Sequence, residues 1–340
     1  MKEEAWMKVS IRDISRMTGY SPATVSNALN YKKGVNQETA AEIFRVAKET
    51  GYISENAIRK IKLVIFRING LIIDDTPFFS ALINGFETEC RKYGYEMVIC
   101  NVDRRNEDYE KQLQTLLHEM GSAVVVLATE MQDEDLDPFR AAACPVLIMD
   151  GWTDRMDFNA VLINNEDSAR MATEYLYEKG HRRIGYIRST FRIRGFKSRF
   201  YGYQAALHKF RLEFDDRNVF TVTPNLNGAY HDMLHHLEKR SSLPTAFFAD
   251  NDLMALGAMK AFQEKGYRIP EDISIIGFDD LPFSEISNPA LTTLRVPNTE
   301  MGQLAVRRIV DIIKKKDRIN AKIQVCTKFV IRDTVRDLNK

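Results

Sequence analysis

The sequence of 340 residues lacks the short motifs that mark several common classes of enzyme. It contains neither the G-x-G-x-x-G nor the G-x-x-x-x-G-K-[ST] loop that holds nucleotide phosphates, and no G-x-S-x-G nucleophile elbow. No group of His and Cys residues has the spacing of a metal site. We therefore expect that the protein is not an enzyme and that it uses neither a cofactor nor a metal ion.

Cysteine pairs and long hydrophobic runs are also missing. No two of the cysteines form a C-x-x-C pair, which favours reduced thiols: Cys90, Cys100, Cys144 and Cys326. No apolar run reaches the roughly 18 residues that a membrane helix needs. The first ten residues, MKEEAWMKVS, lack the apolar region of a secretory signal. These absences predict a cytoplasmic protein without membrane contact.

The chain as a whole has almost no net charge, because its Lys and Arg residues exceed its Asp and Glu residues by only one. The charge is nevertheless uneven, since residues 1–62 contain 11 Lys or Arg against 7 Asp or Glu. The rest of the chain is therefore slightly acidic. A positive N-terminal segment fits a DNA-binding head, although an ordinary solvated surface can carry the same charge.

Segment 9–30 has the pattern of two short helices joined by a tight turn. Its apolar residues fall at helical spacing on either side of Gly19: Ile11, Ile14 and Met17, then Val25, Ala28 and Leu29. Ser10 and Ser21 are suited to cap the two helices, and Pro22 fits the first position of the second. A third helix is predicted from Asn36 as its cap to Gly51 as its terminator. The residues alone also fit a three-helix bundle that merely packs.

This segment and the following ETAAEIFRVAKETGY resemble the N-terminal head of the LacI/GalR family of bacterial transcriptional regulators. The residues that match the family pattern are Asp13, Ile14, Gly19, Ser21, Thr24, Val25, Ser26, Leu29 and Asn30. The resemblance implies a helix-turn-helix domain whose second helix enters the major groove of double-stranded operator DNA.

The predicted DNA-contacting residues lie mainly on that second helix. Pro22 and Ala23 offer only apolar contact, for instance with a thymine methyl group. Asn27 replaces the Arg that is common in the family, and an amide matches adenine better than guanine. We therefore expect an altered operator half-site at that base. The remaining polar residues are expected to hold phosphates and set the register: Ser21, Thr24, Ser26 and Asn30.

Residues 52–62, YISENAIRKIK, connect this head to the rest of the chain. The family resemblance implies a short hinge helix here, with Ile61 as the apolar wedge that opens a base step in the minor groove. Two departures stand out: Ser54 and Glu55 replace the usual Pro-Asn, and Ile58 replaces a small residue. A plain flexible linker is the alternative.

From Leu63 onward, short β-rich runs alternate with helical ones, which predicts parallel sheets covered by helices on both faces. The expected strands are LVIFRI, YEMVICNV, AVVVLA, VLIMD, RIGYI, TAFFA and ISIIGFD, and the expected helices span 78–93, 107–120, 166–179, 199–210, 228–239, 251–265 and 298–315. The charged loop between Met149 and Ile163 divides the body, so we expect two sheets.

The body resembles the two-lobed, periplasmic-binding-protein-like (type I) effector domain of the same family. That resemblance implies three crossings between lobes, near 162–165, 291–295 and 323–328. The expected organisation is a head (1–51), a hinge (52–62), lobe 1 (63–162 plus 295–323), lobe 2 (164–291 plus 328–335) and a tail (336–340).

Polar and aromatic side chains that follow the predicted strands form the candidate effector site: Phe78, Phe79, Asp150, Trp152, Asn251 and Asp279, with Arg199 opening the RFYGY helix. Flat rings with carboxylate and amide groups suit a polyhydroxylated ligand. By resemblance, all except Asp150 and Trp152 occupy effector-contact positions of the family. Structural alternatives exist: one Phe can belong to the core and Asn251 can cap a helix. Arg199 would be costly as an isolated buried cation.

The same region predicts an effector class and a function. Basic residues crowd the segment IRSTFRIRGFKSR, which suits a phosphorylated or acidic sugar unless the segment is a solvated loop: Arg188, Arg192, Arg194, Lys197 and Arg199. We predict a transcriptional repressor that binds a palindromic operator as a homodimer under the control of a sugar or sugar derivative. A solute-binding protein of a transport system, or a sugar-processing enzyme, remains the alternative.

Overall fold

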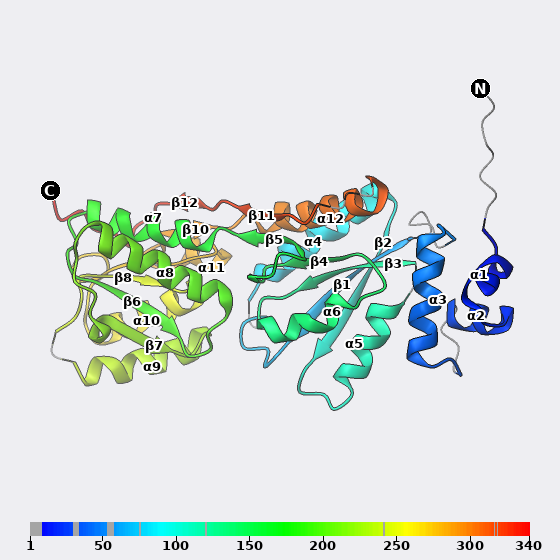
Figure 1. Ribbon diagram of the computed structural model, residues 1–340. Coiled ribbons are helices and arrows are strands. Elements are labelled where there is room, and N and C mark those ends of the chain that lie inside the picture. The colour runs from blue at the N-terminus through cyan, green and yellow to red at the C-terminus, as the bar shows by residue number, and fades with distance from the viewer. Residues whose placement is uncertain are drawn as a thin grey trace, which may run out of the picture.

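The computed structural model describes residues 9–29, 34–52, 58–74, 76–119, 121–240, 242–315, 317 and 319–340. These residues form a small helical head followed by two α/β lobes arranged end to end (Figure 1). Along the described residues, no helix is long and apolar enough to cross a membrane.

The head consists of α1 (Ile11–Thr18), α2 (Pro22–Leu29) and α3 (Gln37–Glu49). Ser10 and Asp13 form a capping box at the start of α1, and Gly19 ends it in the left-handed conformation with φ 74°. Pro22 is the first residue of α2, where it needs no amide donor. The predicted helix-turn-helix is therefore confirmed. A separate apolar cluster holds the helices together: Ile14, Val25, Ala28, Ile43, Val46 and Ala47.

Lobe 1 is built on a parallel sheet of strand order β11-β5-β4-β3-β1-β2. The strands are β1 (Lys60–Arg67), β2 (Glu96–Asp103), β3 (Ser122–Leu127), β4 (Val146–Met149), β5 (Asn159–Ile163) and β11 (Lys322–Val325). Alternate strand residues face opposite sides, so one face packs under α4 (Phe78–Tyr93) and α12 (Asn298–Lys315). The other face packs under α5 (Tyr109–His118) and α6 (Asp137–Arg140).

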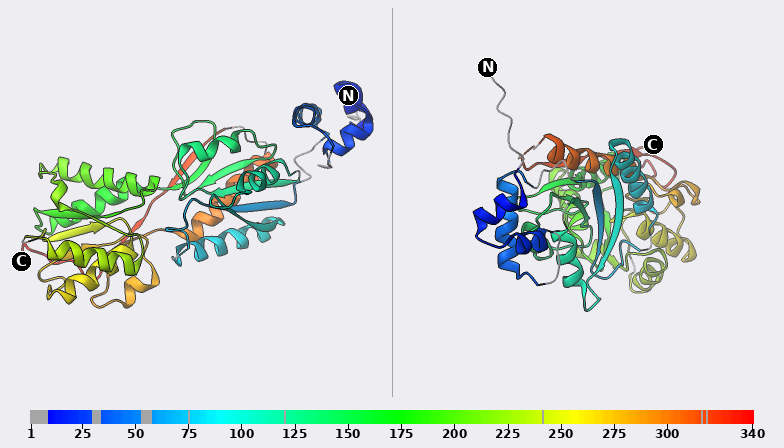
Figure 2. Two further views of the ribbon diagram at one scale, coloured as in Figure 1. Left: turned by 90° about the horizontal axis from the view of Figure 1, so that it is seen from below. Right: turned by 90° about the vertical axis from the view of Figure 1, so that its right-hand side faces the viewer.

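Lobe 2 contains a second parallel sheet, of order β7-β6-β8-β9 (Figure 2). Its strands are β6 (Ile184–Ser189), β7 (Val219–Val222), β8 (Ala246–Ala249) and β9 (Ser274–Ile276). Helices α7 (Asn165–Glu178) and α8 (Arg194–Lys209) pack on one face. Helices α9 (Leu226–Glu238) and α10 (Asp252–Glu264) pack on the other, and α11 (Pro282–Ile286) follows β9. The predicted two-sheet architecture is thus confirmed.

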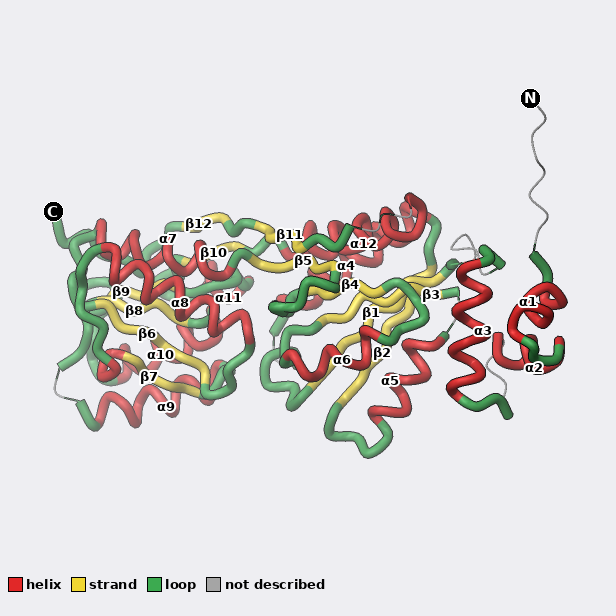
Figure 3. The backbone as a smooth tube through the Cα atoms, in the orientation of Figure 1, coloured by secondary structure: helices red, strands yellow, loops and turns green. Residues whose placement is uncertain are grey.

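Three chain segments join the lobes. The first runs from β5 directly into α7, and the other two contain β10 (Thr293–Arg295) and β12 (Lys328–Val330). These last two strands pair antiparallel as a two-stranded ribbon between the lobes (Figure 3). Because β11 lies in the lobe 1 sheet, the third passage falls at Cys326 and Thr327. The expected tail is docked on lobe 2, where the amide of Leu338 donates to the carbonyl of Lys179 at 2.8 Å.

The prediction that Ile61 is a minor-groove wedge is wrong. Strand β1 begins at Lys60, and Ile61 within it is fully buried in the core of lobe 1. The physical reason is the period of two in a strand, which places Ile61 on the same inward face as Leu63 and Ile65. The hinge therefore ends earlier than expected. Ser54 and Glu55 lie outside the described residues.

Candidate functional site

The candidate DNA-reading surface is the outer face of α2. Val25 and Ala28 point into the head and are buried, which turns the rest of the helix outward. Its N-terminal residues are exposed and its middle is half-buried: Ser21, Pro22 and Ala23, then Thr24, Ser26 and Asn27. Asn30, the remaining candidate, lies outside the described residues.

Hydrogen bonds fix the N-terminus of α2 in place. The Ser21 Oγ accepts from the Thr24 amide at 3.0 Å and lies 2.8 Å from the Thr24 Oγ1. The Tyr20 hydroxyl donates to Glu42 of α3 at 2.9 Å. A capped helix end with its amides facing outward favours contact with a DNA phosphate. The head therefore presents α2 as a rigid element.

Arg199 of α8 is the centre of the candidate effector site and is only 4% exposed. Its Nε donates to Asn165 Oδ1 at 2.8 Å, its Nη1 donates to the carbonyl of Asp250, and its Nη2 lies 3.6 Å from Asp279 Oδ1. The guanidinium carbon stacks 3.5 Å from the centre of the Phe278 ring. These partners offset the cost of burying the charge.

Two buried carboxyl groups from different lobes interact electrostatically with this guanidinium, and Asp279 is the one that lies within 4 Å of it. Asp150 follows β4 in lobe 1 and Asp279 follows β9 in lobe 2, both with positive φ (55° and 113°). Burial raises the pKa of Asp279 to about 8, against the opposing charge of Arg199. Burial likewise raises the pKa of Asp150 to about 6, partly offset by a 2.7 Å hydrogen bond from Thr129. Burial therefore disfavours the charged form of both carboxyl groups.

Two further aspartates, missed from the sequence, support the site. Asp250 accepts from the Tyr186 hydroxyl at 2.5 Å and from the Ser189 amide at 2.7 Å. Asp252 accepts from the Leu281 amide at 2.8 Å and from Thr293 Oγ1 at 2.6 Å, and so ties the loop carrying Asp279 to β10. Both aspartates directly follow the TAFFA strand, and this position could have indicated a site role. Of the three residues there, only Asn251 was predicted to contact the effector.

Asn251 itself serves as the cap of α10, because its Oδ1 accepts from the Met254 amide at 3.0 Å. Phe78 and Phe79 are both buried and meet edge to face, with ring centres 5.1 Å apart. Phe78 also lines a cavity of about 440 Å³ beside the β10–β12 ribbon. Asp279 borders the same cavity, whereas Arg199 and Asp150 do not line it.

Trp152 does not join the Arg199 network. Its Nε1 donates to Asp154 at 3.0 Å, and Lys322 Nζ lies 5.1 Å from its ring centre. Neither partner contacts Arg199 among the described residues. Trp152 packs, partly buried, against the lobe 1 core, and its predicted effector contact stays a prediction.

The basic segment of lobe 2 is balanced by acidic partners. Arg192 pairs with Asp250 and Arg194 pairs with Asp133. Arg188 donates to Thr221 Oγ1 at 3.1 and 3.2 Å, away from both pairs. Three of the five basic residues therefore have acidic partners, Arg192, Arg194 and Arg199, which reduces the expected positive charge of the cleft.

Comparison with known proteins matches both parts of the chain to described families. Residues 10–55 match the family described as "Bacterial regulatory proteins, lacI family", and residues 173–335 match the "Periplasmic binding protein-like domain". The HTH-type transcriptional repressor PurR of Vibrio atlanticus is 30% identical over 335 residues, with 97% of this chain and 99% of that protein covered. Its counterpart from Mannheimia succiniciproducens is 29% identical over 332 residues, with the same coverage.

Solved structures share the fold over almost the whole chain. A lac repressor dimer bound to operator and the anti-inducer ONPF superposes with a TM-score of 0.72 at 22% identity. The transcriptional regulator CelR in its cellobiose complex gives a TM-score of 0.72 at 24% identity. In both cases 96% of this chain and 99% of the other chain are covered.

Proposed function

The chain belongs to the lacI family of bacterial regulatory proteins, and from this we propose that it represses transcription by reading a palindromic operator through α2 while a small effector binds between its lobes. Proteins of this family are DNA-binding repressors that respond to a ligand, and they are not enzymes. Because a DNA-binding head precedes the two-lobed body, the alternatives of a transport solute-binding protein and a sugar-processing enzyme are set aside.

Base reading is proposed for Pro22, Ala23 and Asn27. Pro22 and Ala23 are exposed at the first turn and can contact only apolar base edges, whereas the Asn27 amide can bond to adenine in two places. Ser21, Thr24 and Ser26 are proposed to contact phosphates near the capped helix end. Asn30 stays a proposed phosphate contact on sequence grounds alone.

A homodimer is proposed because one small head offers few base contacts, whereas two heads related by a two-fold axis double them. We propose the head at residues 1–51 and the body from Lys60 onward, with the connecting segment between them. Its DNA target places the protein in the cytoplasm.

The proposed effector is an uncharged, polyhydroxylated molecule such as a free sugar, rather than a phosphorylated or acidic one. The observation that carries this proposal is the buried Asp279, which lies 3.6 Å from Arg199 and whose pKa the charge of Asp150 helps to raise. Sugar hydroxyls can donate to both carboxylates while Arg199 donates back to an oxygen. A phosphate would instead place its charge near the carboxylate of Asp150, which opposes its binding. Phe78 is proposed to supply an apolar wall, while Phe79 and Asn251 have structural roles.

Selection from a randomised DNA pool tests the DNA-reading half of the proposal. The wild-type chain and Asn27→Arg are each incubated with the pool at physiological salt, with and without candidate sugars, and the bound DNA is sequenced. We expect a palindrome whose half-site changes at one base pair in the variant. Enrichment of the same site by both proteins would contradict the assigned role of Asn27, and no enrichment under any condition would contradict the regulator.

Calorimetric titration of free and phosphorylated sugars tests the effector half. We expect binding of an uncharged sugar that Asp279→Asn weakens and that Asp215→Asn, a change at a partly exposed carboxylate paired with Arg217, leaves intact. Preferential binding of the phosphorylated compounds would overturn the proposed effector class.

A further inference from the structure

The two lobes also touch at a place remote from the three connecting segments. Arg194, the first residue of α8 in lobe 2, pairs with Asp133 of lobe 1, and its Nη1 lies 3.9 Å from Asp154 of the same lobe. The two paired side chains are 25% and 26% exposed. An ion pair with about three-quarters of each side chain buried is less screened by solvent than a surface pair.

An apolar contact accompanies this ion pair. Ile72 of lobe 1 is 8% exposed because it packs into the apolar cluster of lobe 2, which includes Ile193 and Phe196. The loop carrying Ile72 is held by Glu130, which is fully buried. Glu130 Oε2 accepts from the amides of residues 68, 69 and 70 at 2.8 to 3.0 Å, and Oε1 accepts from the Ile72 amide at 3.0 Å.

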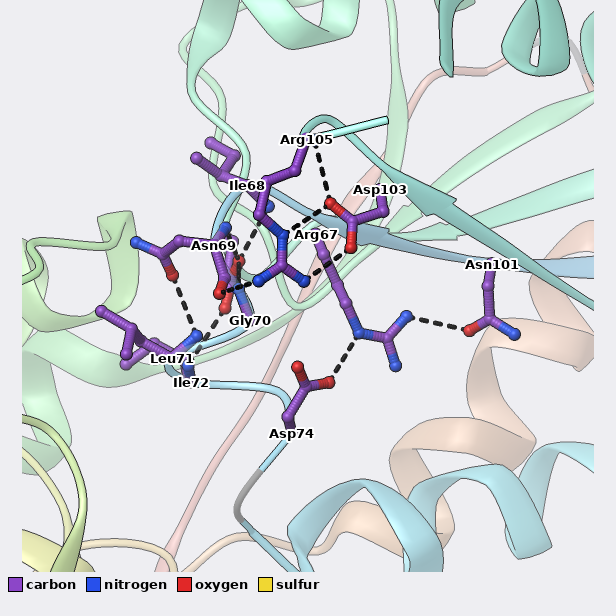
Figure 4. A network of polar contacts seen from close by, with 11 residues as sticks. Arg67, Ile68, Asn69, Gly70, Leu71, Ile72, Asp74, Asn101, Asp103 and Arg105 are labelled. Atoms are coloured by element: carbon purple, nitrogen blue, oxygen red, sulfur yellow. Dashed lines mark hydrogen bonds and ion pairs between the residues drawn. The ribbon is translucent and has the colours of Figure 1, made fainter. Parts of the chain in front are cut away.

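Other bonds stiffen the same loop, as Figure 4 shows. Arg105 Nη1 donates to the carbonyl of Asn69 at 3.1 Å, and Arg67 Nε donates to Asp74 at 2.6 Å. Gly70 has φ +76°, and a Cβ there would lie 2.2 Å from Asp74 Oδ2, so only glycine fits. These contacts therefore hold the Ile72 side chain in place against lobe 2.

Both lobe–lobe contacts arise from short segments that also serve the candidate sites. In lobe 1, Glu130 and Asp133 are three residues apart, so one segment anchors the Ile72 loop and supplies the ion pair. In lobe 2, Arg194 stands at the start of α8, and the same helix carries Arg199 to the effector site. Because Arg194 and Arg199 lie on the same helix, a displacement of α8 moves both residues.

Two polar atoms of this ion pair lack hydrogen-bond partners. Asp133 Oδ1 and Arg194 Nε are both shielded from solvent and have no hydrogen-bond partner among the described residues. Separating the lobes would return both atoms to water, which opposes the attraction between the charges. The two unpartnered atoms therefore offset part of the attraction, so the contact can be broken more easily than a fully satisfied buried pair.

We propose that the Arg194–Asp133 pair is a latch that stabilises the closed arrangement of the lobes, and that Arg194 is a positioning residue linking closure to effector contact at Arg199. The link to the effector rests on the proposed function, whereas the latch itself does not. Breaking the pair should open the lobes even without effector, because the lost attraction belongs to the protein alone.

Distance measurement by double electron–electron resonance tests this in the full-length protein without effector. Nitroxides are attached through an unnatural amino acid at positions 107 and 227, which are exposed, lie on different lobes and leave the cysteines untouched. Labelled chains are diluted into unlabelled protein so that distances within one chain dominate. For Arg194→Ala and for Asp133→Asn we expect the ratio of short to long distances to fall about fivefold, the lower end of typical coupling between states.

The charge swap Arg194→Asp with Asp133→Arg should restore much of the short-distance population. The matched control is Lys179→Ala, which removes an ion pair to Asp337 within lobe 2 at similar exposure, 29% and 21%. Circular dichroism shows whether each variant is folded, and Asp133→Asn provides a nearly isosteric change if Arg194→Ala unfolds. Distances in both single variants that equal those of the wild type would overturn the latch.

Operator affinity of the same variants separates the latch from the proposed function. An affinity that changes together with the distances supports both. Variants that open while operator affinity stays at the wild-type value would uphold the latch and contradict the control of DNA binding by lobe closure.

Discussion

Replacement of Asp279 by Asn should change how the stability of the body depends on pH. Asp279 has its pKa raised from 3.8 to about 8 by burial, and its side chain is only 12% exposed. The charged neighbours are Arg199 on α8, which lowers this pKa, and Asp150 and Asp252, which raise it. Asn has the same shape and hydrogen-bonding reach without a proton to lose.

The sign follows from proton linkage. Between pH 3.8 and about 8 the folded chain keeps the Asp279 proton that the unfolded chain has released, so stability falls as pH rises through this window. Each pH unit in the window is worth about 1.4 kcal/mol. Between pH 6.0 and 7.5 the wild type should therefore lose roughly 2 kcal/mol relative to Asp279→Asn.

Urea unfolding of the effector-free protein measures this difference at a fixed protein concentration, since dimerisation also affects apparent stability. The control is Asp215→Asn, whose carboxyl has a pKa that Arg217 lowers, so its effect should be constant above pH 5. A stability difference between Asp279→Asn and wild type that stays constant from pH 6.0 to 7.5 would refute the assignment of a neutral Asp279. It would also contradict the proposal that the effector donates a hydrogen bond to Asp279.

Three further outcomes are expected. Binding of an uncharged sugar should release up to one proton per site near pH 7, because hydrogen-bond donors to Asp279 favour its ionised form. Titration calorimetry in buffers of different ionisation enthalpy measures the number of protons released. A value of zero would contradict this expectation. Ile61→Ala should lower the free energy of unfolding in urea by about 2–4 kcal/mol, because Ile61 is fully buried. Fluorescence anisotropy should show unchanged operator affinity of the folded variant. A weaker affinity would instead support the predicted insertion of Ile61 into the minor groove. Gly85→Ala should lower the unfolding midpoint, because its Cβ would lie 2.1 Å from the carbonyl oxygen of Thr299 on α12; a midpoint equal to the wild type would refute that close approach.

The sequence predicted regular elements best where periodicity and end signals agreed. Helices α4 and α12 occupy the predicted ranges 78–93 and 298–315, and Gly94 ends α4 with φ 78° as its position suggested. By contrast, β5 was hidden inside a charged loop and β7 within a mixed stretch.

The candidate sites were less predictable because their chemistry depends on contacts between distant residues. Arg199 was expected to be costly if buried without partners, and its partners come from α7, the residue after β8 and the loop after β9. The basic composition around it suggested an anion, whereas Asp133 and Asp250 compensate two of those arginines from remote positions. Local sequence charge therefore does not show which of these arginines have acidic partners, because those partners are distant in the sequence.

The connection between head and body limits how the lobes can act on DNA. Gly51 ends α3 in the left-handed conformation, and the Arg59 amide already donates to Gly121 of the body at 3.0 Å. Ile58 packs against the lobe 1 core, so the free tether is shorter than the expected hinge. Seven residues, 52–58, span roughly 25 Å when extended and about 10 Å as a helix. In the proposed homodimer, a change in how the two bodies pair would therefore alter the spacing of the two heads.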